Sequence, residues 1–111
     1  MKMSALFDLS GKVAVVTGGN GGIGRGIAIG LAEAGASVAI FGRNDDKNQH
    51  VLSDLNAIGV PSIAVKIDLT DRAAAATALR RVESELGNIS ILVNNAGTCF
   101  RPMWSRPRAS W

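Results

Sequence analysis

The octet TGGNGGIG, which begins at Thr17, contains five glycines and could bind a phosphate group. A glycine-rich turn between a buried strand and a helix offers backbone N–H groups and the positive end of the helix dipole to a pyrophosphate, and it has no Cβ atom to keep the phosphate away. A glycine-rich turn without a ligand is the alternative. The octet fits two patterns, GxGxxG at Gly19, Gly21 and Gly24, and TGxxxGxG at Gly18, Gly22 and Gly24.

The residues that follow the second apolar run distinguish these patterns. GxGxxG is accompanied, about 20 residues further on, by an acidic residue that binds the ribose 2′-OH. That region, residues 41–44, reads FGRN and contains no acid, while Asp45 and Asp46 suit the first turn of a helix. Arg43 could instead bind a 2′-phosphate, because its planar guanidinium can donate two parallel hydrogen bonds. A solvated arginine at a strand end is the alternative.

Two further polar stretches follow predicted strands. Asp68 comes directly after SIAVKI and could accept a hydrogen bond from an adenine amino group, but Asp68 or Thr70 could equally cap the next helix. NNAG, residues 94–97, follows SILV. Its amides can both donate and accept hydrogen bonds, although asparagine and glycine are also ordinary turn residues.

Four short apolar runs, predicted as strands, alternate with three helical stretches. The strands are expected at 12–17, 37–41, 62–67 and 90–93. The helices are expected to end at Gly35, Gly59 and Gly87, the second capped by Asn44 and the third by Thr70. The predicted apolar stripes are Ile23, Ile27, Leu31 and Ala34 in the first helix and Val51, Leu52, Leu55 and Ile58 in the second, with Gly26 and Gly30 allowing close approach of the first helix to the sheet.

This alternation predicts an α/β fold of the Rossmann-like, doubly wound type, with a parallel sheet in the order 3-2-1-4. The first two crossovers should cover one face of the sheet and the third the other. The topological switch then falls between strands 1 and 4, where ligands bind at the carboxyl ends of the strands. The octet and NNAG are expected at that point.

Composition excludes several other classes of protein. The 111 residues, 47% hydrophobic and 19% charged, predict one globular domain. Residues 1–97 contain nine Lys/Arg and nine Asp/Glu, so no basic surface for nucleic acid is expected. The single cysteine, Cys99, excludes an internal disulfide and a cysteine-based metal site and suits the cytoplasm. No apolar stretch is long enough for a signal peptide or a membrane span.

The motifs in combination, with the lead-in FDLSGKVAVVTGG, strongly resemble the short-chain dehydrogenase/reductase family over residues 7–97. The lead-in also resembles the branch that contains gluconate 5-dehydrogenase and 2-deoxygluconate 3-dehydrogenase. The resemblance implies that TGxxxGxG is the working pattern, that Asp68 lies beside the adenine and that Asn95 stabilises the central sheet. The predicted cofactor-binding residues are Gly18, Asn20, Gly21, Gly22, Ile23, Gly24, Arg43, Asn44, Asp68, Leu69, Asn95, Ala96 and Gly97.

The resemblance implies a nicotinamide dinucleotide and an oxidoreductase that transfers hydride between NAD(P) and an alcohol or carbonyl. Arg43 favours NADP(H); NAD(H) is the alternative, because Gly21 stands where many NADP-preferring relatives carry a basic residue. The family uses a serine and a YxxxK motif, and this chain has no tyrosine, so we predict no catalytic residue. We expect the isolated chain to bind cofactor without turnover. A non-catalytic nucleotide-binding or interaction module, or a truncated or frameshifted product, is the alternative.

The character of the sequence changes after Gly97. Residues 98–111 contain both tryptophans, two of the three prolines, three arginines and no acid. We therefore predict a nucleotide-binding domain over 1–97, truncated after its fourth strand, and an aberrant basic tail over 98–111. Full-length relatives are expected to be homo-oligomers. The exposed apolar edge SILVNN predicts marginal stability and self-association of this chain.

Overall fold

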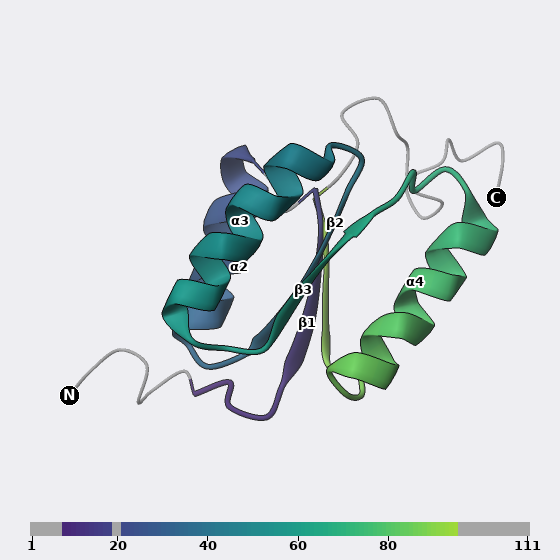
Figure 1. Cartoon of the computed structure of the whole chain (residues 1–111). Helices are drawn as coiled ribbons and strands as arrows, with labels where there is room; N and C mark the ends of the chain where they lie inside the picture. The colour runs from purple at the N-terminus through teal and green to yellow at the C-terminus, as the bar shows by residue number, and fades with distance from the viewer. Residues whose placement is uncertain (1–7, 19–20, 96–111) are drawn as a thin grey trace, which may run out of the picture.

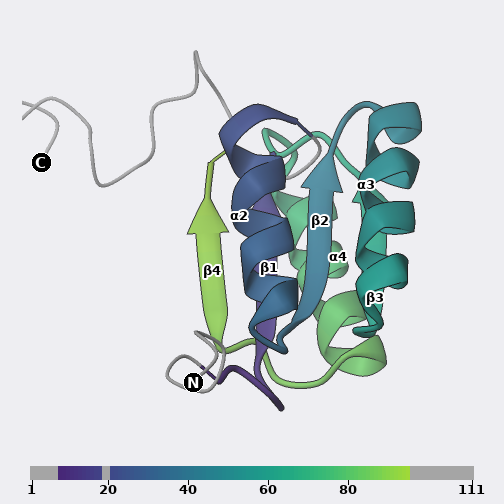
Figure 2. The same cartoon turned by 90° about the vertical axis from the view of Figure 1, so that its left-hand side faces the viewer.

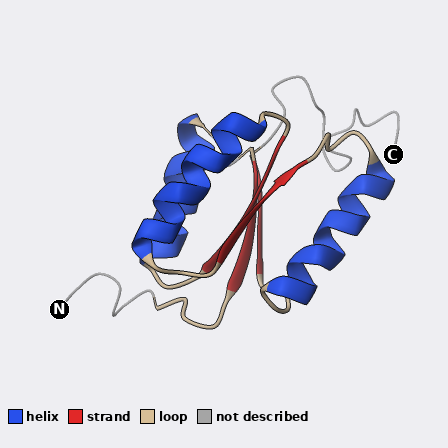
Figure 3. Ribbon diagram, in the orientation of Figure 1, coloured by secondary structure: helices blue, strands red, loops and turns tan. Residues whose placement is uncertain are grey.

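The computed structural model describes residues 8–18 and 21–95 as three layers, with a sheet between two helices on one face and one helix on the other (Figure 1). Figure 3 shows the strands enclosed between the helices. The strands are β1 (Val13–Thr17), β2 (Ser37–Gly42), β3 (Ser62–Lys66) and β4 (Ile91–Asn94), and the helices are α2 (Gly22–Glu33), α3 (Asp45–Ile58) and α4 (Arg72–Glu85).

The sheet is parallel and has the order β3-β2-β1-β4, which confirms the predicted topology. Val15 on β1 pairs with Ala39 on β2 and with Leu92 on β4. Figure 2 shows the strands running in the same direction, so that their carboxyl ends share one edge. The chain reverses order at β1, since β2 and β4 lie on either side of it, and the glycine-rich octet follows β1 at that switch point.

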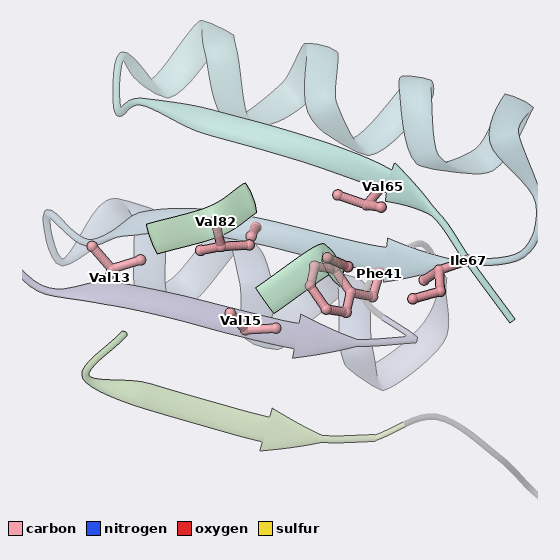
Figure 4. Packing of buried hydrophobic residues seen from close by; sticks show 8 residues of the cluster. Val13, Val15, Phe41, Val65, Ile67 and Val82 are labelled. Carbon is pink, nitrogen blue, oxygen red and sulfur yellow. The ribbon is translucent and has the colours of Figure 1, made fainter. Parts of the chain in front are cut away.

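Alternation along the central strands divides the buried residues into two clusters. Val13 and Val15 face α4, where they pack with Phe41 and Val82 (Figure 4). Val16 faces the other way and packs with residues of α2 and α3. Both faces of β1 are therefore buried, which is why this strand reads as a continuous apolar run.

The face of α2 that meets the sheet differs from the predicted stripe. The buried residues are Gly24, Ala28 and Ala32, whereas Ile23 is 76% exposed. Of the predicted stripe, Leu31 packs against the cluster on this face, whereas Ile23 does not. The prediction of large residues as the inner stripe was wrong in this respect, because small residues lie where the helix is closest to the strands. The role given to Gly26 and Gly30 was also wrong, since both are exposed and a Cβ on either would meet nothing within 4 Å.

The caps of α3 and α4 show one confirmed prediction and one correction. Asn44 caps α3 by accepting a hydrogen bond from the Lys47 N–H at 3.0 Å, as expected. The cap of α4 is Asp71, which accepts from the Ala74 N–H at 3.0 Å. The prediction of Thr70 was wrong by one residue, because the Thr70 hydroxyl is bound to Asp68 instead.

The edges of the sheet are β3 and β4 within the described residues. Leu92 on β4 is 61% exposed and lies on the same face as Val15, with which it pairs. Figure 1 places α4 over that face. In the described ranges, no helix is long and apolar enough to cross a membrane. The predicted tail, residues 98–111, lies outside the described part of the chain.

Candidate functional site

The backbone of the glycine-rich turn favours one of the two patterns. Gly18 and Gly22 have φ values of +66° and +57°, in the left-handed region that favours glycine. Gly21, which only GxGxxG requires, has φ of −171° and open space where its Cβ would lie. Gly19 lies outside the described residues. The described geometry therefore fits TGxxxGxG, the pattern that the resemblance implied.

Gly24 is the third glycine of that pattern and is required for a different reason. A Cβ on Gly24 would lie 2.1 Å from the carbonyl oxygen of Gly18 and 2.6 Å from Nδ2 of Asn95. Both distances are too short for a methyl group at this position. The missing side chain thus lets the end of β1, the start of α2 and the end of β4 converge on one point.

The N-terminus of α2 differs from those of α3 and α4. Gly21 provides no side-chain cap to α2, and the first turn of α2 carries no acidic residue. The first helical hydrogen bond runs from the Arg25 N–H to the Gly21 carbonyl at 3.3 Å, so the N–H groups of residues 22–24 have no acceptor within the helix. The other two helices use Asn44 and Asp71 as side-chain caps. The start of α2 is therefore the helix end best suited to an anion.

Thr17 joins the ends of β1 and β4, a role that its place in the TGxxxGxG pattern does not indicate. Its side chain is buried, and its Oγ1 accepts a hydrogen bond from the Asn95 N–H at 2.9 Å. The same hydroxyl lies 3.2 Å from the Val93 carbonyl oxygen and 3.1 Å from Oδ1 of Asn94, and it can donate its one proton to either. A threonine at the end of an otherwise apolar strand was the available signal.

Arg43 and Asp68 lie at the carboxyl ends of β2 and β3, and both are exposed. Oδ1 of Asp68 accepts from the Thr70 hydroxyl at 2.7 Å and from the Thr70 N–H at 3.0 Å. These two hydrogen bonds lower the pKa of Asp68, and the positive charge of Arg43 adds a smaller effect in the same direction. Arg43 and Asp68 therefore lie on the same rim of the sheet, where the charge of Arg43 acts only weakly on the carboxylate.

The remaining predicted residues divide between site and scaffold. Ile23 is exposed beside the turn, while the side chain of Asn44 is engaged in capping α3. Leu69 is partly buried and packs against the cluster under α4. Asn20, Ala96 and Gly97 lie outside the described residues.

A groove of about 410 Å³ lies between β3 and α4, beneath the free edge of the sheet. Val65, Ile67, Ala74 and Ala78 contribute to its mainly apolar lining. Its eight lining residues include no histidine, cysteine or carboxylate, so the groove has no acid/base pair. In the described part of the chain, no group of three or more His, Cys, Asp or Glu side chains could hold a metal ion.

Comparison with known proteins identifies the family. Residues 12–111 match the short chain dehydrogenase family. The chain is 39% identical over 107 residues to gluconate 5-dehydrogenase from Gluconobacter oxydans, an alignment that covers 96% of this chain and 42% of the relative.

Two solved structures support the same assignment. A short-chain type dehydrogenase/reductase from Mycobacterium marinum superposes with a TM-score of 0.80 at 37% identity, covering 99% of this chain and 45% of that one. The Pseudomonas aeruginosa RhlG/NADP active-site complex superposes with a TM-score of 0.74 at 40% identity, covering 83% of this chain and 37% of that one. The chain spans less than half the length of these relatives. Residues 12–111 match this family, and the glycine-rich turn has the backbone geometry given above. The chain therefore belongs to the short-chain dehydrogenase/reductase family.

Proposed function

We propose that this chain is the NAD(P)-binding part of a short-chain oxidoreductase, which transfers hydride between NADP(H) or NAD(H) and an alcohol or carbonyl substrate. The observation that carries the proposal is the junction of Gly24 with Gly18 and Asn95, which fixes the uncapped start of α2 at the switch point of the sheet. A glycine-lined helix N-terminus at that location is suited to a pyrophosphate.

The described residues fit a dinucleotide in three parts. The N–H groups at the start of α2, residues 22–24, would hold the pyrophosphate. Arg43 and Asp68 would hold the adenosine end, the first through the 2′-phosphate and the second through the adenine amino group. Asn95, with Ala96 and Gly97, would line the side that receives the nicotinamide. The cofactor supplies the hydride donor or acceptor when it is bound.

The choice of NADP(H) rests on the end of β2. Arg43 follows this strand, and the segment between Phe41 and Asn44 has no carboxylate to accept the ribose hydroxyl and repel a phosphate. The RhlG relative was solved as a complex with NADP. We infer that Arg43 binds the 2′-phosphate of NADP(H), and NAD(H) remains the weaker ligand.

The substrate class that we propose is a sugar acid, by analogy with the gluconate 5-dehydrogenase relative. We place the protein in the cytoplasm, where NAD(P) is available, and assign cofactor binding to residues 1–97, with 98–111 as a separate tail. Because the 111 residues contain no tyrosine, the chain lacks the acid/base group that the family resemblance implies. We therefore propose that the isolated chain binds cofactor but does not turn over.

This last point supports a second candidate, a nucleotide-binding module without catalysis. Calorimetric titration of the 111-residue chain with NADPH and NADH, followed by an assay with gluconate and NADP⁺, tests both functions. We expect binding of both dinucleotides, tighter for NADPH, and no turnover. Failure to bind either dinucleotide would contradict the proposed function, and measurable turnover would contradict the claim that this chain alone is inactive.

A further inference from the structure

Asn48 is a fully buried polar residue on the inner face of α3. It stands on the same side of the helix as Val51 and Leu55, which are also buried, and an apolar residue at this position could equally have packed against the sheet. Burial of an amide costs free energy unless its hydrogen bonds are replaced. The contacts of this amide therefore indicate what it does.

The Asn48 side chain donates hydrogen bonds to the ends of two strands. Nδ2 lies 2.9 Å from the carbonyl oxygen of Gly42, the last residue of β2. It lies 3.4 Å from the carbonyl oxygen of Val65, near the end of β3. One amide group on α3 thus holds both strand ends at the edge where the candidate site lies.

The Gly42 carbonyl has a second donor, the N–H of Ile67, at 3.1 Å. That hydrogen bond is the last backbone link between the β2 and β3 segments before the strands separate. The residue after Gly42 is Arg43, and the residue after Ile67 is Asp68. The hydrogen bonds of Asn48 to both strand ends therefore help to set the distance between these two charged residues.

Asn48 also helps to fix the direction in which the chain leaves β2. Only residues 43 and 44 separate this strand from α3, and Asn44 caps the helix. The Asn48 N–H itself donates to the Asn44 carbonyl at 3.0 Å. Arg43 is thus held between a strand end and a helix start, both bonded to Asn48, so its backbone has little freedom to move.

We propose that Asn48 is a positioning residue for recognition of the cofactor's 2′-phosphate. It acts through Arg43 and Asp68, whose separation it fixes, and it does not touch the ligand. The proposal rests on the proposed function and deepens it, because it names a buried residue that sets the preference between NADP(H) and NAD(H).

The test compares Asn48→Leu with Leu55→Ala in the 111-residue chain. Asn48→Leu keeps a side chain of similar size and removes both hydrogen bonds, whereas Leu55→Ala weakens the same helix at a position remote from Arg43. The probes are 2′,5′-ADP and 5′-AMP, which differ in the 2′-phosphate. We expect Asn48→Leu to weaken binding of 2′,5′-ADP about ten-fold, as for loss of one charge-assisted hydrogen bond, with a change of less than about two-fold for 5′-AMP. Leu55→Ala should leave the ratio of the two affinities unchanged.

Two further variants guard against a purely structural effect. Asn48→Ser keeps a shorter donor and should give an intermediate ratio, even if Asn48→Leu fails to fold. In an Arg43→Ala background, substitution of Asn48 should no longer change the ratio, because the residue through which it acts is gone. If Asn48→Leu and Asn48→Ser both leave the ratio of the 2′,5′-ADP and 5′-AMP affinities unchanged, the role of Asn48 is overturned while the proposed function stands. A wild-type chain that binds neither NADPH nor NADH would overturn the proposed function as well.

Discussion

Gly24 lies so close to Gly18 that a methyl group on its Cα would sit 2.1 Å from the Gly18 carbonyl oxygen. Gly24→Ala must therefore separate α2 from the end of β1, and we expect it to lower the free energy of unfolding by about 1–3 kcal/mol, as for overpacking of a core. Cofactor binding should weaken with it. Chemical denaturation and calorimetric titration measure the two effects.

The matched control is Gly26→Ala in the same helix. Gly26 is exposed, and a Cβ there would meet nothing within 4 Å, so alanine should raise the free energy of unfolding by about 0.5–1 kcal/mol through its better helix propensity. Equal effects of the two substitutions would show that the close approach at Gly24 has no structural role.

Thr17→Val tests the connection between β1 and β4. Valine has nearly the same shape but leaves the Asn95 N–H without its acceptor, so we expect a loss of about 1–3 kcal/mol in the free energy of unfolding. Thr17→Ser keeps the hydroxyl and should lose less. A valine variant as stable as the wild type would contradict the account of this junction.

Thr70→Ala tests the electrostatics at the rim. The Thr70 hydroxyl and N–H hold the pKa of Asp68 below its ordinary value of 3.8, and removal of the hydroxyl should raise this pKa toward that value. The folded-state pKa lies below the unfolded one, so ionised Asp68 stabilises the fold at neutral pH, and this contribution is lost as the pH falls below about 4. Carbon NMR titration of the carboxyl groups measures the shift. The pKa of Asp8, which Ser10 lowers, should not change.

Arg43→Asp tests the choice of cofactor. An aspartate at the end of β2 would repel a 2′-phosphate and could accept a hydrogen bond from the ribose 2′-OH, so the preference should change from NADPH to NADH. Arg43→Lys retains the charge but not the planar fork, and it should retain a weaker preference for NADPH. Tighter binding of NADH by the wild type would contradict the role of Arg43.

Leu92→Lys tests association through the β4 edge. Leu92 is 61% exposed on a strand whose only partner among the described residues is β1. We expect the 111-residue chain to self-associate as its concentration rises and the lysine variant to associate less, because charge discourages edge pairing. Analytical ultracentrifugation checks this, with Ile58→Lys on α3 as the control. A wild type that stays monomeric, with a sharp unfolding transition at high temperature, would contradict the prediction.

The fold could be predicted from the sequence because its signals are strong and local. The apolar runs of β1 and β2 are buried on both faces, and glycines and caps such as Asn44 mark the ends of the elements. Alternation of strands and helices then leaves few topologies, of which β3-β2-β1-β4 is the one observed.

The inner face of α2 could not be predicted from periodicity. The apolar residues Ile23 and Ile27 fit one helical stripe, but the stripe that meets the sheet is Gly24, Ala28 and Ala32. By hydrophobicity alone, isoleucine is expected to be buried before glycine or alanine. The close packing of α2 on the sheet instead requires small side chains at the points of contact. The required glycine is identified only once Gly18 and Asn95 are placed beside it.

The polar junctions were equally hidden. Thr17 bonds to Val93, which is 76 positions away in the sequence, and Asn48 bonds to Val65, which is 17 positions away. No local pattern in the sequence connects such residues. The cap of α4 was misassigned by one residue, since Thr70 and Asp71 are both good capping residues and only the bond from Thr70 to Asp68 decides between them. Local motifs therefore do not indicate these contacts, which depend on tertiary structure.

The most direct test of cofactor binding at the start of α2 is a two-dimensional amide NMR titration of the 111-residue chain with NADPH. We expect the largest chemical-shift changes for the N–H groups of Gly22, Ile23 and Gly24, with smaller ones at Arg43 and Asp68. Shifts confined to the groove between β3 and α4, at Thr77 and Arg81, would contradict it, as would a spectrum that NADPH leaves unchanged.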